Sequence, residues 1–250
     1  MCLRSVARGG RRLLSPDVAA PRSDVHDLGA PVSGPVWLEP WVDEPAGEDA
    51  DPLRAVLERE SIELAFVAAL QHLSAAQRAV LLLRDVLGFS ADETAHALST
   101  SAVAVNSSLQ RARATVRERV PERTQQAELA ALGDERAPLV RAFADAWERA
   151  DVDALVAMLA DDVRFTMPPL PAWFEGRDDV ARFLAERVFA TPWRLTPIEI
   201  NAQPAFVCEQ DAGAGFRHGA INVLAFRDGR VTWIAGFVDP ALARHLAHRR

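Results

Sequence analysis

The stretch SADETAHALSTSAVAVNSSLQRAR, residues 90–113, decides the fold of the first half of the chain, because it contains two short helices with almost nothing between them. Ser90 is followed by Glu93 at the third helical position, which is the pattern of a capping box. Ser101 begins the second helix, and Ser99 stands in the turn, where glycine is common. The sequence therefore predicts two helices joined by a tight turn.

The two faces of the second helix differ in character. Ala95 is small enough to let the helices touch, and Val105, Leu109 and Ala112 form an apolar inner face. The candidate DNA-binding residues are of types that contact base edges or phosphates: Ser101, Ala104, Asn106, Ser107, Gln110, Arg111 and Arg113. The pattern predicts a helix-turn-helix that binds DNA. An ordinary helical hairpin with a solvated polar face would show a similar pattern.

The composition limits what the rest of the chain can be. The 250 residues carry a formal net charge of −7, which argues against a protein that coats nucleic acid by bulk charge. Cys2 and Cys208 are isolated, and no apolar run approaches the roughly 18 residues that span a bilayer. Neither a zinc-ligand spacing nor a phosphate-binding loop is present. We therefore expect a cytoplasmic protein with no membrane partner, no cofactor and no metal.

Changes in composition divide the chain into zones. A stretch rich in Pro, Gly, Asp and Glu cannot bury a core, so we expect a linker there, with Trp37 and Trp41 docked on a neighbouring surface. The expected zones are a basic piece at 1–14, this linker at 15–52, a helical domain at 53–123, a helical hinge at 124–137 and a mixed domain at 138–250. The sequence thus predicts two domains.

The last zone is predicted to be α+β, because two helices, at 139–150 and 152–160, precede several alternating or apolar runs. Asp161 and Asp162 are expected to cap or end a helix. A tight turn is predicted at Asp228–Gly229. The predicted strands cover 163–167, 195–203, 205–210, 220–226 and 230–238.

Residues 65–116 resemble the domain of extracytoplasmic-function sigma factors that reads the −35 promoter element. AVNSSLQRAR, residues 104–113, is similar to the recognition helix of that domain, where the pattern V-x-S-x-L-x-R-A-R is usual. The resemblance implies that promoter DNA and the RNA polymerase core are partners of this chain.

Other segments resemble one subgroup of these sigma factors. Residues 143–184 look like the opening of SnoaL-like polyketide cyclases and nuclear-transport-factor-2-like folds, and VWLEPW at 36–41 is similar to a Trp-Leu-x-Pro linker element. Residues 1–14 resemble the end of sigma region 2, which binds the polymerase core and melts the −10 element, and we expect most of that region to be missing. The implied fold is multi-domain: an all-α helix-turn-helix (sigma region 4) domain followed by an α+β SnoaL-like, cone-shaped domain.

The SnoaL-like resemblance implies a conical pocket that holds a small-molecule ligand. The candidate lining residues are Trp173, Phe174, His218, Asn222 and Trp233. His218 and Asn222 are expected to share one strand face, because side chains alternate with a period of two. Enzymes of this fold use a buried carboxylate or an Asp/His pair as general base, but Met167 stands where isomerases place an aspartate, and the chain has no tyrosine to hold an oxyanion. We therefore expect this domain to regulate rather than to catalyse.

Three hypotheses follow. The leading one is a sigma-type transcription initiation factor, not an enzyme, that binds the −35 element and the polymerase core and carries a fused regulatory domain. A second is a non-sigma helix-turn-helix regulator that binds palindromic half-sites as a dimer. A third is a cyclase or isomerase, for which His218, Asp239 and Glu209 are the available general bases.

Overall fold

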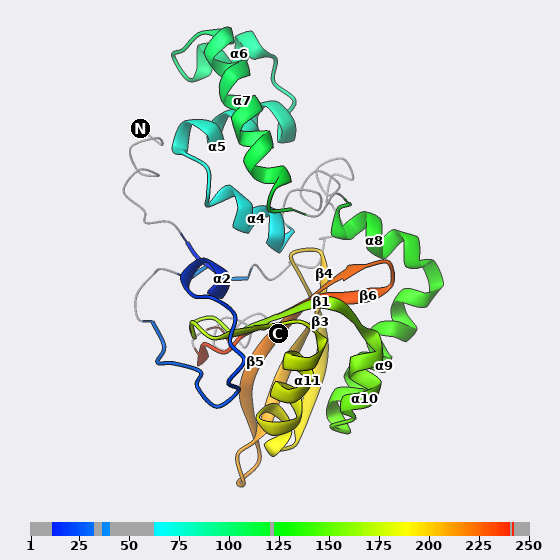
Figure 1. The fold of residues 1–250 in the computed structure, drawn as a ribbon. Helices are drawn as coiled ribbons and strands as arrows, with labels where there is room; N and C mark the ends of the chain where they lie inside the picture. The colour runs from blue at the N-terminus through cyan, green and yellow to red at the C-terminus, as the bar shows by residue number, and fades with distance from the viewer. Residues whose placement is uncertain (1–11, 33–36, 41–62, 121–122, 241, 243–250) are drawn as a thin grey trace. The chain divides into compact units, whose positions relative to one another are not determined.

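The computed structural model describes residues 12–32, 37–40, 63–120, 123–240 and 242 (Figure 1). The chain forms two compact units, and each is built from separate stretches of sequence. The first unit comprises residues 1–13 and 45–122, and the second comprises residues 14–44 and 123–250. The second unit therefore surrounds most of the first one in sequence.

The described part of the first unit is all helical, and Ser90 and Ser101 begin helices as predicted. Ser74, Ser90 and Ser101 accept hydrogen bonds from backbone N–H groups of the turn that follows, and the first two form full capping boxes. The helix that begins after Ser74 continues past its α-helical part as a π-helix. The elements are α4 (Leu64–Leu70), α5 (Ala75–Leu81), the π-helix η1 (Leu82–Val86), α6 (Ala91–Ala97) and α7 (Ala102–Arg117).

The core of this unit confirms the predicted inner face. Val105, Leu109 and Ala112 of α7 are buried together with Ala95 of α6. They pack in one cluster with apolar residues of α4 and α5 and of the turn between them: Leu70, Leu73, Val80 and Leu81. The helix-turn-helix is therefore held by one continuous apolar seam, which leaves the opposite face of α7 exposed.

Ser99, in the turn between α6 and α7, adopts a φ of 53°. Side chains other than glycine are disfavoured in this left-handed region by about 1–2 kcal/mol. We expect Ser99→Gly to stabilise the first unit by up to about 1 kcal/mol, which slower hydrogen exchange of the α7 amides would reveal. Thr100→Gly is the matched control: Thr100 is outside the positive-φ set, so this change should destabilise the unit. Faster exchange in Ser99→Gly would contradict the prediction.

The second unit is α+β, with a six-stranded sheet in the order β2-β1-β6-β5-β4-β3. The β1–β6 pair is parallel and the other pairs are antiparallel. The strands are β1 (Leu159–Thr166), β2 (Trp173–Glu175), β3 (Trp193–Ile200), β4 (Gln203–Asp211), β5 (Phe216–Arg227) and β6 (Arg230–Phe237). The predicted turn at Asp228–Gly229 is confirmed: both residues have positive φ, as a two-residue hairpin loop requires.

Helices α9 (Arg136–Glu148), α10 (Val152–Met158) and α11 (Arg177–Glu186) pack on one face of the sheet (Figure 1). Aromatic side chains fill the space between the helices and the strands. Phe143 stacks on Phe206 with ring centroids 5.8 Å apart, and Phe174 stacks on Phe183 at 4.4 Å. A short helix η3 (Val188–Ala190) follows α11. Buried aromatic pairs of this kind hold the helical layer in a fixed position on the sheet.

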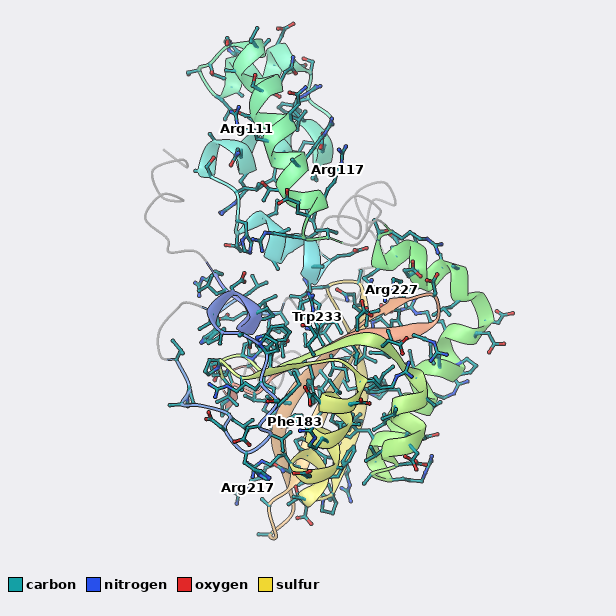
Figure 2. All side chains as sticks on the ribbon, viewed as in Figure 1. Arg111, Arg117, Phe183, Arg217, Arg227 and Trp233 are labelled. Atoms are coloured by element: carbon teal, nitrogen blue, oxygen red, sulfur yellow. The ribbon has the colours of Figure 1, made fainter. Side chains whose placement is uncertain are left out.

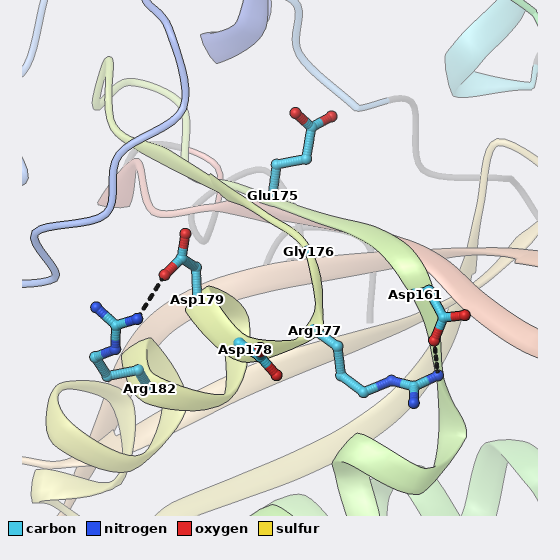
Figure 3. Close-up of a pocket in the computed structure, with 7 residues that line it drawn as sticks. All are labelled: Asp161, Glu175, Gly176, Arg177, Asp178, Asp179 and Arg182. Atoms are coloured by element: carbon cyan, nitrogen blue, oxygen red, sulfur yellow. Dashed lines mark hydrogen bonds and ion pairs between the residues drawn. The ribbon is translucent and has the colours of Figure 1, made fainter.

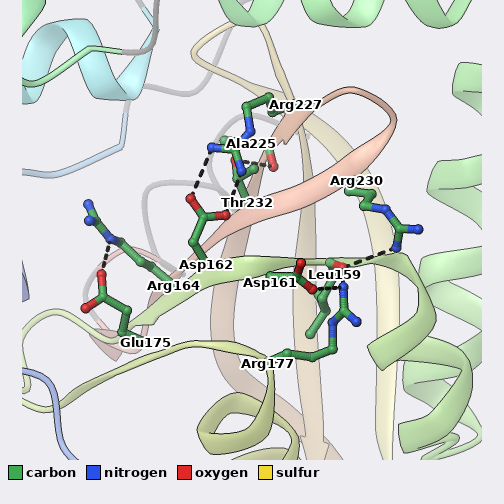
Figure 4. Close-up of polar contacts among 10 residues, drawn as sticks. All are labelled: Leu159, Asp161, Asp162, Arg164, Glu175, Arg177, Ala225, Arg227, Arg230 and Thr232. Atoms are coloured by element: carbon green, nitrogen blue, oxygen red, sulfur yellow. Dashed lines mark hydrogen bonds and ion pairs between the residues drawn. The ribbon is translucent and has the colours of Figure 1, made fainter.

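The prediction that Asp161 and Asp162 cap or end a helix is wrong, because both residues lie within β1. Asp162 accepts hydrogen bonds from Arg227 of β5 at 3.1 and 2.6 Å (Figure 4), and these bonds lower the pKa of its carboxyl group. Arg164 donates from Nε to Glu175 of β2 at 2.9 Å. These charged side chains lie on β2, β1 and β5, from the β2 edge of the sheet inward.

The described residues of the expected linker pack against the second unit. Residues 14–32, which we call the strap, include α2 (Ser15–Val18) and pack against the loop between β1 and β2. Val25 of the strap is 3% exposed and belongs to the main core of the second unit. Backbone and side-chain hydrogen bonds tie the strap to this loop: Ser15 Oγ to Leu170 O at 2.9 Å, Arg22 N to Trp173 O at 2.8 Å, Trp173 Nε1 to Ala19 O at 2.8 Å and Val32 N to Pro169 O at 3.0 Å.

Trp37, one of the two tryptophans of the expected linker, is buried. Trp37 is 7% exposed, and its Nε1 donates to Val32 O at 2.9 Å. Trp41 lies outside the described residues. Trp37 is thus docked within the second unit, whereas a solvated spacer would leave it exposed.

The expected hinge is a helix attached to the sheet. Residues 125–132 form α8 (Gln125–Leu132), and the helix ends at Gly133, where the 3₁₀-helix η2 (Gly133–Glu135) begins. Gln125 is 3% exposed and makes two hydrogen bonds to the backbone of β5: Nε2 donates to Phe226 O at 2.9 Å, and Oε1 accepts from Phe226 N at 2.6 Å. This pair of bonds attaches the segment to the second unit.

Across the described ranges, every helix is too short or too polar to cross a bilayer.

Candidate DNA-reading helix and C-terminal cavity

The outward face of α7 carries most of the predicted DNA-binding residues. Ala104, Asn106, Gln110 and Arg111 are exposed, and Ser107 is half-buried. Figure 2 shows Arg111 projecting from this helix. Because the first turns of a recognition helix contact base edges in the major groove, these side chains are available for reading bases.

Ser101 and Arg111 have additional contacts within the helix. Ser101 Oγ accepts from the backbone N–H of Ala104 at 3.2 Å, so this hydroxyl caps α7. Its proton stays available to donate to a phosphate oxygen. Arg111 Nη2 donates to Ser108 Oγ at 3.3 Å, which restrains the exposed guanidinium near the middle of the helix. Both residues are therefore pre-positioned on the outward face.

Arg113 is held differently from the other predicted DNA-binding residues. Its Nε and Nη2 donate to the two carboxylate oxygens of Asp85 at 2.9 and 2.7 Å, and this hydrogen bonding raises the pKa of the guanidinium. Asp85 lies in the π-helix η1, so the pair joins α7 to the preceding element. Arg113 is thus exposed like its neighbours on α7, but its guanidinium is already paired within the protein.

The second unit contains a cavity of about 270 Å³ between the helices and the sheet. Apolar and aromatic side chains form most of its wall, and the strap contributes one of them. The lining residues are Leu28, Trp147, Phe165, Met167, Leu170, Phe183, Arg187, Val188, Trp193, Gln210, Gly219, Ala220, Asn222, Gly236 and Val238. A cavity of this size and composition is suited to a small organic ligand.

Asn222 lies in the wall of this cavity, but the other four candidate pocket residues do not. Phe174 is fully buried in the core against Phe183. Trp173 and Trp233 lie on the opposite face of the sheet: Trp233 pairs in register with Arg164, and its Nε1 donates to Thr166 Oγ1 at 2.9 Å.

His218 and Asn222 do not share a face of β5, because a bulge at Gly219 changes the alternation. Cys208 pairs with Ala220, whereas the next residue, Glu209, pairs with His218. The extra residue turns His218 to the side of Glu209 and away from Asn222. A Cβ at Gly219 would lie 2.5 Å from the Trp193 ring, so the bulge also makes room for that ring.

A second, open hollow lies over β1 and the start of α11 (Figure 3). Two ion pairs lie within it: Arg177 Nη2 contacts Asp161 Oδ1 at 2.6 Å, and Arg182 Nη2 contacts Asp179 Oδ1 at 2.8 Å. Within the part of the chain that the structure describes, no group of three or more His, Cys, Asp or Glu side chains is placed to hold a metal ion. We assign no ligand to this hollow.

Comparisons with known proteins match both units. Residues 63–116 match the family described as sigma-70, region 4, and residues 140–234 match the SnoaL-like domain. The ECF RNA polymerase sigma factor SigG of Mycobacterium tuberculosis is 36% identical over 247 residues, which cover 96% of this chain and 65% of SigG.

The chain is a relative of the extracytoplasmic-function sigma factors. The sigma factor SigJ of Mycobacterium tuberculosis is 29% identical over 224 residues, covering 80% of this chain and 68% of SigJ. The crystal structure of SigJ has a similar fold, with a TM-score of 0.55 at 23% identity, covering 81% of this chain and 74% of that one. The region 4 domain and the SnoaL-like domain thus follow each other in the predicted order.

Sequence reasoning missed Val103 in the region 4 domain. Val103 is 76% exposed and lies on the outward face of α7, one turn before Ser107 and two turns before Gln110. Apolar side chains on this face contact thymine methyl groups in the major groove. The helical period places Val103 on the side of α7 opposite Val105, so the sequence contained the signal. It was overlooked because an apolar residue suggests the buried face of a helix.

His218 in the SnoaL-like domain provides a test of pH dependence. Burial lowers the pKa of this imidazole from its usual 6.5, although Glu209 and Asp239 act in the opposite direction. A lowered folded-state pKa contributes stability that is present above pH 6.5 and is lost as the pH falls through the folded-state value. We expect His218→Gln to lose less stability than the unsubstituted protein between pH 7.5 and 5.5, measured by urea unfolding. Equal losses in the two proteins would contradict this.

Proposed function

We propose that this chain recognises the −35 element of promoter DNA through α7 and acts with the RNA polymerase core in transcription initiation. The observation that carries the proposal is the exposed face of α7, with Asn106, Gln110 and Arg111 outward, in a segment that matches sigma-70 region 4. Amide and guanidinium groups on a recognition helix read adenine and guanine edges. The matched relatives are sigma factors, and this chain spans 65% of the length of SigG.

Selection of duplex DNA by the full chain tests promoter recognition and separates it from its main rival. A sigma-type reader should enrich one asymmetric motif, because a single α7 contacts one site. A dimeric regulator would enrich a palindrome with half-sites about one helical turn apart. Failure to enrich any sequence over random duplexes would overturn the proposal.

Copurification with RNA polymerase core tests the second part of the proposal. We expect the full chain to bind purified core and to increase the affinity of core for a duplex with the selected motif. A chain that binds the motif but not the core would support the non-sigma regulator instead. This function would be exercised in the cytoplasm, where the chromosome and the polymerase are found.

We further propose that the SnoaL-like domain binds a regulatory ligand and is not an enzyme. Among the described residues that line the cavity, Arg187 is the only one with an ionisable side chain. His218, Glu209 and Asp239, the available general bases, are outside this lining. A cyclase or isomerase needs a general base within hydrogen-bond reach of its substrate, so the wall of this cavity favours binding over turnover. A change in promoter affinity when the cavity is filled would support the regulatory role.

A further inference from the structure

The wall of the cavity carries two buried polar atoms without hydrogen-bond partners. Asn222 is 1% exposed and its Oδ1 has no partner; Trp147 is 2% exposed and its Nε1–H has none. A buried donor or acceptor without a partner destabilises the fold. One acceptor and one donor at the wall of the same cavity can be satisfied together by a ligand that offers both functions.

Glycine at position 236 keeps the space in front of the Asn222 amide open. A Cβ there would lie 3.0 Å from Asn222 Oδ1 and 3.1 Å from the Phe165 ring. Because Gly236 has no side chain, the amide oxygen of Asn222 is left uncovered on this side. Asn222 and Gly236 are directly paired across β5 and β6, so this arrangement is fixed by the sheet register.

The charge of the lining selects against ions. No carboxylate is among the described lining residues, so a cation would have no counter-charge. The guanidinium of Arg187 belongs to an exposed residue, and the deep polar groups, Trp147 and Asn222, are neutral. Because burying an unpaired charge is strongly unfavourable, the interior suits a neutral molecule.

The volume sets the size of the molecule. An engineered cavity of about 150 Å³ holds benzene in another protein, and this cavity measures about 270 Å³. The rings of Phe165, Phe183 and Trp193 in the wall provide flat apolar contact. Two fused rings therefore match the space and its surface.

We propose that the cavity of the SnoaL-like domain binds a neutral compound of about two fused rings that carries a hydroxyl group. The hydroxyl oxygen accepts the Trp147 N–H, and a hydroxyl proton is donated to Asn222 Oδ1. Leu28 of the strap closes one side of the site, so the ligand contacts the strap as well as the sheet. This inference names the ligand class for the regulatory binding proposed above and rests on that role.

Equilibrium dialysis of the full chain with three probes tests the ligand class. The probes are 2-naphthol, naphthalene, which lacks the hydroxyl, and 2-naphthoate, which is charged. We expect 2-naphthol to bind about tenfold more tightly than either of the others, since it alone satisfies both polar atoms without burying a charge. Equal binding of 2-naphthol and naphthalene, tighter binding of 2-naphthoate, or no binding of 2-naphthol would overturn the proposal.

Substitutions in the wall locate the binding. Trp147→Phe and Asn222→Leu each remove one polar partner while keeping an apolar side chain, so each should weaken 2-naphthol binding about three- to tenfold and leave naphthalene nearly unchanged. Ala220→Leu fills the space and should abolish binding of both. Binding of 2-naphthol that all three variants retain would place the probe elsewhere and overturn the proposal. If Trp147→Phe does not fold, Asn222→Leu and Ala220→Leu carry the same test.

The outcome also separates this inference from the regulatory role. Tight, hydroxyl-dependent binding of 2-naphthol supports the ligand class whatever happens to promoter affinity. If that binding leaves promoter affinity unchanged, the regulatory role fails while the site stands.

Discussion

Arg111→Ala is expected to lower the affinity of the full chain for its selected promoter motif about ten- to hundredfold. Arg111 is exposed on the outward face of α7, and a guanidinium that pairs with a guanine edge contributes about 1–3 kcal/mol of discrimination. Fluorescence anisotropy with the selected duplex and with a scrambled duplex measures the effect. The loss should be much larger on the selected duplex, because base contacts carry specificity and phosphate contacts do not.

Arg113→Ala is the matched control for this measurement. It removes the same charge two residues away on the same helix, but Arg113 is paired with Asp85. We expect a smaller and sequence-independent loss of DNA affinity, with a stability cost below about 1 kcal/mol, since both partners of the pair are partly solvated. If Arg113→Ala relaxed the sequence preference and Arg111→Ala did not, our assignment of the reading face would be wrong.

Gln125→Ala is expected to destabilise the second unit by about 2–4 kcal/mol. The substitution leaves the N–H and C=O groups of Phe226 without their side-chain partner in a buried place, and each such group costs about 1–3 kcal/mol. The five tryptophans that the structure describes all lie in the second unit. Urea unfolding followed by tryptophan fluorescence therefore reports mainly on this unit.

Gln125→Glu provides the graded control. A carboxylate keeps an acceptor for Phe226 N–H but presents no donor to Phe226 O when it is ionised. The free energy of unfolding of Gln125→Glu should be lower than that of the unsubstituted protein. It should rise toward that value as the pH is lowered and the carboxyl group becomes protonated. If Gln125→Ala left the unfolding midpoint unchanged, α8 would not be anchored by this residue, and the hinge expected from the sequence would be the better description.

Local signals in the sequence predicted the helical unit well. Capping boxes need residues only three positions apart, and the inner face of α7 follows from the helical period, so Ser90 and Val105 could be assigned directly. The same local reasoning could not show that Arg113 is paired, because its partner Asp85 is 28 residues away and lies in a π-helix. A local pattern has no information about such a partner.

The cavity was harder to predict than the sheet around it. Alternating residues indicated the strands, but a single extra residue at Gly219 reversed the face of His218 relative to Asn222. The lining comes from the strap, three helical segments and several strands, so no short motif contains it. Trp147 was missed because its position on an apolar helix face suggests core packing, and only its unpaired N–H distinguishes it.

The strap has a consequence for how the protein is made. Ala19 and Trp173, which share a hydrogen bond, are 154 residues apart. A ribosome that adds about 5–20 residues per second needs roughly 8–30 seconds to cover that distance. For this time the nascent strap has emerged without the loop and the strand to which it is hydrogen-bonded, while the helical unit between them can already fold. The β1–β2 loop and β2 must then capture a segment that left the ribosome well before them.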